Sequence, residues 1–254
     1  MLSGTKGSGR SRGVRLQARV TTACAAAVAV LIVALTALSG PASARSAGNR
    51  SHPRHKRSGP AAKGERKLSA GIVIKLTPPS EKMPQTNEIN LFVPQGFRDA
   101  GVTMPKCSPT TLKAKGPKGC PKKTVVGSGT SIGYTILGGD YVVEHLKLTM
   151  FNGPGGDLLT YVEGKTPVEI EEIVTGLISA PKGFGREFAF AIPHGLLEPL
   201  PQAPGWLQTL NAHLSGRVGW LRTTSCPPHP WHLKAELGYT NGEGVSIETE
   251  LACQ

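Results

Sequence analysis

Two cysteines bracket the segment that most constrains the fold of this chain. Twelve residues separate Cys107 from Cys120, in the sequence CSPTTLKAKGPKGC. Ser108 can accept a hydrogen bond from a free N–H of a first helical turn, and Pro109 suits the first helical position. The glycine after Thr110–Lys115 can adopt the left-handed conformation that ends a helix. The pattern predicts a short helix closed by a Cys107–Cys120 disulfide, which contributes roughly 3 kcal/mol on a loop-entropy argument.

The cysteine count indicates an oxidising compartment. Cys24 lies in an N-terminal apolar run, and four cysteines follow it: Cys107, Cys120, Cys226 and Cys253. An even count in an exported protein favours two disulfides, for which three connectivities are open. We favour 107–120 and 226–253, because each pair brackets one supersecondary unit. Zinc is the weaker interpretation, since the chain has no C-x-x-C and His229 and His232 lie in a proline-rich turn. No metal or cofactor is predicted.

The first 44 residues have the three parts of a secretory signal. Residues 1–19 carry five Lys/Arg and no acid, an apolar run covers 23–38, and Ala42-Ser43-Ala44 provides a small-residue cleavage site. The pattern predicts a signal peptide (1–44) that is cleaved after Ala44, and therefore a secreted or cell-envelope location. An uncleaved N-terminal membrane anchor stays open as the alternative, because basic residues flank both sides of the run.

The positive charge of the chain is concentrated near the N-terminus. Residues 45–67 hold eight Lys/Arg and one Glu, a composition that predicts a disordered basic linker. Residues 68–254 hold sixteen Lys/Arg and sixteen Asp/Glu, so the net charge of +12 gives no support to a nucleic-acid-binding domain. The linker could contact anionic cell-envelope polymers or lipid headgroups.

Residues 68–254 are expected to form a single β domain. Short apolar alternations are separated by turns rich in Gly, Pro, Asn and Asp. The expected strands are 72–76, 89–93, 124–137, 141–152, 157–162, 168–179, 187–192, 231–239 and 245–251. We interpret 195–205 as a loop, and 206–218 is compatible with a strand or a short helix. The pattern predicts an all-β fold: a disulfide-clamped β-sandwich, Ig-like or jelly-roll-like, with one short helix.

Several short motifs resemble those of a protein family. They are Val93-Pro94-Gln95-Gly96-Phe97, Cys107 with Leu112, Gly116 with Cys120-Pro121, Val126-Gly127-Ser128-Gly129, Cys226-Pro227 before a tryptophan-containing strand, and the near-terminal Cys253. In this order the motifs resemble an uncharacterised family of secreted, β-rich proteins from high-GC Gram-positive (actinobacterial) bacteria. The resemblance spans about residues 70–253 and implies export and a β-rich fold, without an activity.

Two patterns could carry hydrolytic chemistry. Ser131 lies in a G-x-S-x-G sequence, but both flanks are predicted strands, whereas a nucleophile elbow needs a strand, a sharp turn and a helix. Glu169, Glu171 and Glu172 form the densest acidic cluster, and in a strand the first two share a face. A solvated sheet face explains them without invoking a glycosidase pair. No coherent catalytic set emerges.

Three tryptophans are candidate ligand contacts. Trp206, Trp220 and Trp231 each follow Gly or Pro near a loop, where a ring could stack on a ligand or pack in the core. We therefore expect an exported, non-catalytic binding or structural module of the cell envelope or extracellular space. The alternative is a secreted hydrolase, either esterase-like through Ser131 or glycan-acting through the acidic cluster.

Overall fold

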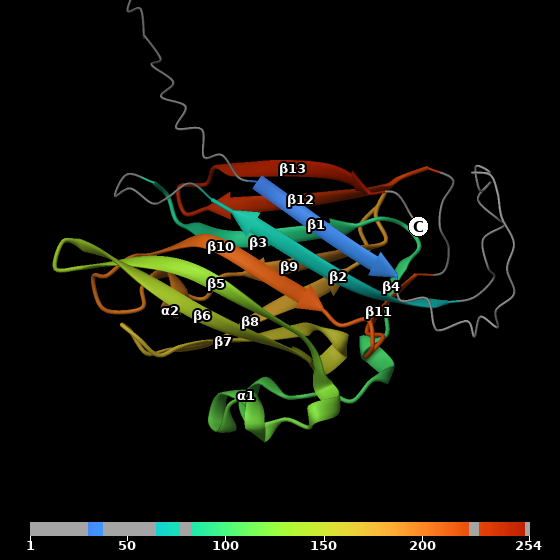
Figure 1. The fold of residues 1–254 in the computed structure, drawn as a ribbon, viewed down its shortest axis with the longest axis horizontal. Helices are drawn as coiled ribbons and strands as arrows, with labels where there is room; N and C mark the ends of the chain where they lie inside the picture. Colours follow the sequence, from blue (N-terminus) through green and yellow to red (C-terminus); the bar gives the residue numbers. More distant parts are fainter. Residues whose placement is uncertain (1–29, 38–64, 77–82, 224–228, 252–254) are drawn as a thin grey trace, which may run out of the picture.

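A computed structural model of the chain describes residues 30–37, 65–76, 83–223 and 229–251, which form an all-β, sandwich-like fold (Figure 1). The strands are β1 Val30–Ala37, β2 Arg66–Lys75, β3 Thr86–Val93, β4 Phe97–Asp99, β5 Val125–Leu137, β6 Asp140–Asn152, β7 Leu158–Gly164, β8 Ile170–Ser179, β9 Arg186–Ala191, β10 Gly205–Leu214, β11 Leu221–Thr223, β12 Trp231–Tyr239 and β13 Gly244–Leu251. The helices are α1 Pro109–Lys115 and α2 His194–Leu197, and the 3-10 turns are Gly101–Thr103, Pro117–Gly119, Lys122–Thr124 and Pro154–Gly156. Cys226, Cys253, the cleavage site after Ala44 and most of the predicted linker lie outside the described residues.

The strands pair antiparallel in one continuous sheet. Its order is β13-β12-β3-β9-β8-β7-β6-β5-β10-β2-β11-β4, and β1 pairs with β2 outside this path. The expected strands are confirmed, and the ambiguous stretch 206–218 contains a strand, β10. The strands β1, β4 and β11 were not expected, and β1 lies within the predicted signal peptide (1–44). The helix α2 occupies part of the predicted loop 195–205, so the prediction of one short helix is incomplete.

Alternation along β6 shows how the sequence directs one face of the sheet inward. Glu144, Leu148 and Met150 are buried, whereas His145 and Lys147 between them are exposed. Since successive strand side chains point to opposite faces, β6 has one interior and one solvent face. Its hairpin partner β5 follows the same rule, with Ser131 and Thr135 buried.

The sheet curls so that strands distant in its order face each other. Ile74 of β2 packs in one cluster with Ile89 of β3 and Leu237 of β12. These strands stand at opposite ends of the sheet order. The apolar faces of the two ends therefore enclose a common interior, which the front strands β2, β5 and β10 cover in Figure 1.

The disulfide-closed helix packs on the outside of this sheet. Ser108 caps α1, its Oγ accepting the Thr111 N–H at 3.0 Å, and the Cys107–Cys120 disulfide is present as predicted. The two cysteines and the fully buried Leu112 pack against the outward side chains Phe151, Leu159 and Tyr161. The segment thus shields the outer face of β6 and β7 from water.

A buried polar contact fixes the connection between β4 and α1. The Asn152 side chain is fully buried, donates to the carbonyl oxygens of Gly101 and Pro105 at 2.9 and 3.0 Å, and accepts the Trp220 indole N–H at 2.8 Å. One amide at the end of β6 thereby satisfies groups from two other segments, residues 101–105 and Trp220.

The described domain begins before the predicted boundary at residue 68. Arg66 and Lys67 belong to β2 and pair with Thr223 and Arg222 of β11. Arg222 also forms an ion pair with Glu65 at 2.8 Å. Two of the basic residues assigned to the linker are therefore part of the sheet. No helix in the described part of the chain is both long and apolar enough to cross a membrane.

Candidate functional site

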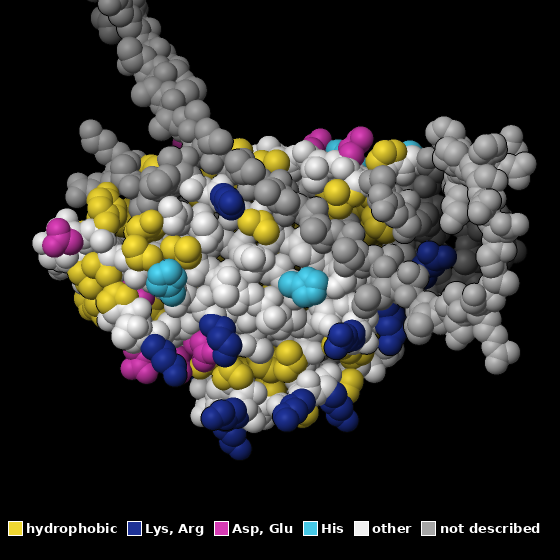
Figure 2. All heavy atoms as spheres, viewed as in Figure 1, with side chains coloured by type: hydrophobic (Ala, Val, Ile, Leu, Met, Phe, Trp, Pro, Cys, Tyr) yellow, Lys and Arg dark blue, Asp and Glu magenta, His cyan; other side chains and the backbone are white. Residues whose placement is uncertain are grey.

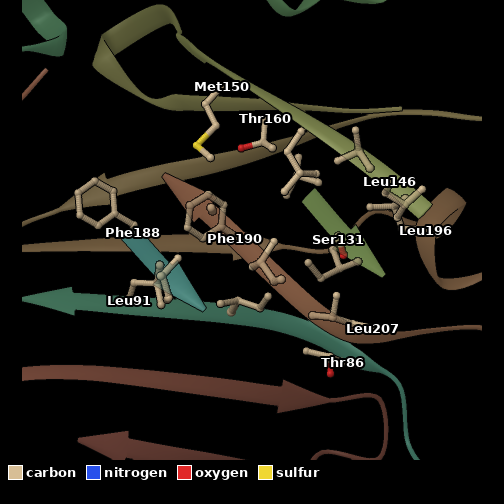
Figure 3. Close-up of a pocket in the computed structure, with 18 of the residues that line it drawn as sticks. Thr86, Leu91, Ser131, Leu146, Met150, Thr160, Phe188, Phe190, Leu196 and Leu207 are labelled. Carbon is tan, nitrogen blue, oxygen red and sulfur yellow. The ribbon is translucent and has the colours of Figure 1, made fainter. Parts of the chain in front are cut away.

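The interior of the curled sheet contains an apolar cavity of about 230 Å³ (Figure 3). Side chains from β2, β3 and β5 through β12 line it, together with α2. Inward-facing residues such as Leu91, Leu207 and Leu210 remain only partly buried, although they belong to the interior. The two halves of the sheet are thus held too far apart for their side chains to fill the space between them. For comparison, an engineered apolar cavity of about 150 Å³ binds benzene or xenon.

The wall is apolar along most of its length. Figure 3 shows Leu91, Met150, Phe188 and Phe190 toward one end, and Leu146, Leu196 and Leu207 toward the other, beside Ser131. Leu196 belongs to α2, which the Gln85 amide connects to the sheet by donating to the carbonyl oxygens of Leu197 and Gly205. The helix that sequence reasoning missed therefore covers this second end.

A buried carboxyl group without a partner lies in this wall. Glu144 lines the cavity with only 2 % of its surface exposed, and neither carboxylate oxygen forms a hydrogen bond to a described residue. Burial raises the pKa of Glu144 above its ordinary value. The Val168 backbone and the neighbouring His145 act in the opposite direction and lower the pKa of Glu144. The Val168 backbone does not, however, form a hydrogen bond with either carboxylate oxygen. An unpaired buried carboxyl group costs stability, so packing alone does not explain it.

Two other acidic side chains of the domain have ion-pair partners. Asp99 is also largely buried, but it accepts the Arg186 Nε–H at 2.7 Å. Glu163 pairs with Lys147 on the outer face of the sheet. Glu144 differs from both, because neither of its carboxylate oxygens has an ion-pair or hydrogen-bond partner among the described residues.

Residues of β5 provide further polar atoms beside Glu144. Gly133 pairs directly with Glu144, and Ser131 and Thr135 occupy the diagonal positions on the same inward face. A methyl group at the Gly133 position would lie 3.9 Å from the Glu144 Cβ but only 3.2 Å from the Trp206 carbonyl oxygen, so the backbone of β10 passes close to Gly133. We define the polar end of the cavity as Ser131, Gly133, Thr135 and Glu144, all of which line it.

Both hydroxyl groups at the polar end already donate. Ser131 Oγ donates to the Thr209 carbonyl oxygen at 2.7 Å. Thr135 Oγ1 lies within donating distance of the carbonyl oxygens of Ala203 and Pro204, at 3.3 and 3.1 Å. A hydroxyl group has one proton to donate and two lone pairs. What remains free on these two residues is therefore acceptor capacity.

The structure places Ser131 in the middle of a strand. Its neighbours on both sides belong to β5, as the sequence indicated, and not to the strand–turn–helix of a nucleophile elbow. His145 pairs with Ile132 in the adjacent strand and points to the outer face. The G-x-S-x-G pattern thus contributes a cavity-lining hydroxyl group and is not arranged for nucleophilic attack.

None of the three glutamates at the start of β8 is among the residues that line the cavity, although Glu172 lies between the lining residues Ile170 and Val174 on the same face. Glu169 and Glu171 are exposed, and Glu172 packs against Gly195 of α2. Glu171 contacts Tyr161 on the outer face, where burial and this carboxylate raise the pKa of Tyr161 to about 12. These residues do not converge on a common cleft.

The three tryptophans are buried. Trp220 is fully buried in the core, and Trp231 makes an edge-to-face contact with Phe97 with ring centroids 4.6 Å apart. Trp206 lines the cavity, and its indole N–H donates to the Met83 carbonyl oxygen at 3.0 Å. Of the three candidate ligand contacts, Trp206 alone lines the cavity.

A basic patch covers the disulfide-closed segment. Its six exposed lysines are Lys106, Lys113, Lys115, Lys118, Lys122 and Lys123. None of them forms an ion pair with a described carboxylate, and no acidic residue occurs between Asp99 and Asp140. Figure 2 shows Lys and Arg side chains gathered at the lower edge, over α1 of Figure 1. The neutral net charge of 68–254 conceals this local concentration.

Sequence reasoning missed Glu144, although a signal for it exists. Along β6 the inward positions are Val142, Glu144, Leu146, Leu148 and Met150, so an acid occupies one place in an apolar register. The curvature that leaves the cavity open has no comparable signal in a single sequence. No protein-family model, curated protein or solved structure matches this chain.

Proposed function

We propose that the protein is an exported, non-catalytic binding module whose β domain holds an apolar ligand, such as an alkyl or acyl chain. The apolar cavity of about 230 Å³ inside the sheet carries this proposal. A globular interior is normally packed to crystal-like density, so an unfilled apolar space of this size is a feature that a ligand can use. The N-terminal pattern of residues 1–44 supports export.

Hydrophobic transfer supplies the affinity. Each methylene group moved from water into an apolar environment contributes about 0.8 kcal/mol, which corresponds to roughly a fourfold change in Kd. A chain that places several methylene groups in the cavity can therefore offset the cost of association.

The positively charged regions of the protein favour a partner whose surface is anionic. We place residues 45–67 near anionic cell-envelope polymers or lipid headgroups, and the six lysines of the basic patch add a second positive region on the folded domain. A protein that binds an alkyl chain would in this way be held close to membrane lipids, a source of such chains.

A fluorescence titration tests the cavity proposal. The full chain is titrated with N-phenyl-1-naphthylamine, an apolar probe that brightens on leaving water, at high salt so that charge contributes little. We expect saturable binding with one probe per chain and displacement by decane. The control variant is Leu177→Gln, because Leu177 is 59 % exposed and does not line the cavity. If Leu177→Gln abolishes binding while decane does not compete, the probe binds a surface patch and the proposal is wrong.

A further inference from the structure

The polar end of the cavity offers hydrogen-bond acceptors; the other buried polar atoms without a partner among the described residues belong to Asn90, Trp231 and Tyr239, which do not line the cavity. The Ser131 and Thr135 hydroxyls donate to backbone carbonyl oxygens, so their remaining lone pairs are acceptors. Both oxygens of the Glu144 carboxyl group lack a donor among the described residues.

We infer that the bound ligand is an amphiphile whose end group donates hydrogen bonds, a hydroxyl or an ammonium, to Glu144 while its apolar chain fills the cavity. This inference rests on the proposed function, because it needs the chain to occupy the interior. Glu144 is 2 % exposed and lines the cavity, so the ligand is the partner that its carboxyl oxygens otherwise lack. A ligand carrying a carboxylate would instead place two acidic groups together in an apolar space, which is unfavourable.

The spacing of the strands allows Glu144 and the hydroxyl groups to act on one end group. Ser131 and Thr135 flank Gly133, which pairs with Glu144, so their side chains rise from one face at diagonal positions. Gly133 contributes no side chain between them, and all four residues line the cavity from which a ligand end group would approach. Glu144 is therefore the main acceptor, and Ser131 and Thr135 can each accept one further hydrogen bond.

The experiment compares ligands of equal chain length on the full-length protein. Kd is measured for decane, 1-decanol, decylammonium and decanoate by displacement of N-phenyl-1-naphthylamine at neutral pH. In the unaltered protein we expect decanol or decylammonium to bind about tenfold more tightly than decane, as for one satisfied buried hydrogen bond, and decanoate to bind more weakly.

Two substitutions assign the preference to Glu144. Glu144→Leu should bind decane at least as well as the unaltered protein and lose the preference for the donor end group. Glu144→Gln keeps the shape and an acceptor oxygen, so it should retain decanol binding and lose tight decylammonium binding. The matched control is Val143→Thr, an exposed and outward-facing position of the same strand, which should leave all four Kd values unchanged.

The outcomes separate this inference from the proposed function. If decane does not displace the probe from the unaltered protein, the proposed function is wrong. If decane binds and neither donor ligand binds more tightly, or if the preference persists in Glu144→Leu, the cavity binds chains but the inference about Glu144 is overturned.

Discussion

Enlarging a small side chain in the cavity wall should stabilise this protein. Ala212 of β10 lines the cavity, is only partly buried, and pairs with Ile72 of β2 and Gly129 of β5. Ala212→Leu adds three carbon atoms to the wall. At about 0.8 kcal/mol per buried methylene group, less roughly 0.5–1 kcal/mol of side-chain entropy, the free energy of unfolding should rise by about 1.5 kcal/mol.

The sign of this change distinguishes an open cavity from a packed core. In a packed core, inserting the same atoms lowers stability by about 1–3 kcal/mol. Ala203→Leu provides the matched control, because Ala203 is 3 % exposed and does not line the cavity. We expect urea denaturation to show stabilisation for Ala212→Leu and destabilisation for Ala203→Leu.

The same substitution should weaken ligand binding. Three added carbon atoms displace about three methylene groups of a bound chain, and at about fourfold per group Kd should rise by roughly 50-fold. If Ala212→Leu lowers stability as much as Ala203→Leu does, or leaves Kd unchanged, the interior is not an open binding space.

Three further predictions address other parts of the account. Asn152→Ala leaves the buried Trp220 N–H and the carbonyl groups of the segment before α1 without a partner. The free energy of unfolding, measured by urea denaturation, should therefore fall by about 3–5 kcal/mol. A decrease below about 1 kcal/mol would contradict the network. Burial raises the folded-state pKa of Glu144, so wild-type stability should be lost as pH rises from the ordinary value of 4.5 through the folded-state value. Glu144→Gln removes this loss, and the stability difference between variant and wild type should therefore grow with pH; a difference independent of pH would refute it. Replacing the six lysines of the basic patch by glutamine should weaken sedimentation with anionic vesicles at low salt, leave probe binding unchanged, and have no effect on neutral vesicles.

Features determined by local chemistry could be predicted from the sequence. The Ser108 cap, the proline at the first helical position and the bracketing cysteines defined α1 and its disulfide, because each depends on neighbouring residues alone. The long alternation of apolar and polar residues likewise predicted the strand β6. β4 and β11 have three residues each and are too short to show a period. The ambiguity of β10 has a structural cause, since a register shift between Leu207 and Thr209 interrupts its alternation.

The candidate site depended on long-range geometry and was not predictable in the same way. Ser131 was noted for a motif that the fold does not use, and its cavity-lining role follows from the pairing of β5 with β10. Of the three tryptophans, the sequence could not indicate that Trp206 would line the cavity while Trp220 and Trp231 packed elsewhere in the core. The sequence shows Glu144 as an acidic residue at an inward position of an otherwise apolar strand face. Its candidate role as a ligand contact, however, depends on the cavity that it lines.

The most direct test of the account is the dependence of affinity on chain length. Kd is measured for a homologous series of 1-alkanols, each below its solubility limit, against the full-length protein and against Ala212→Leu. We predict that Kd falls about fourfold per added methylene group until the cavity is filled and then levels off, with the plateau reached at shorter chains in Ala212→Leu. An affinity that is independent of chain length, or a series that is identical in the two proteins, would contradict binding inside the sheet.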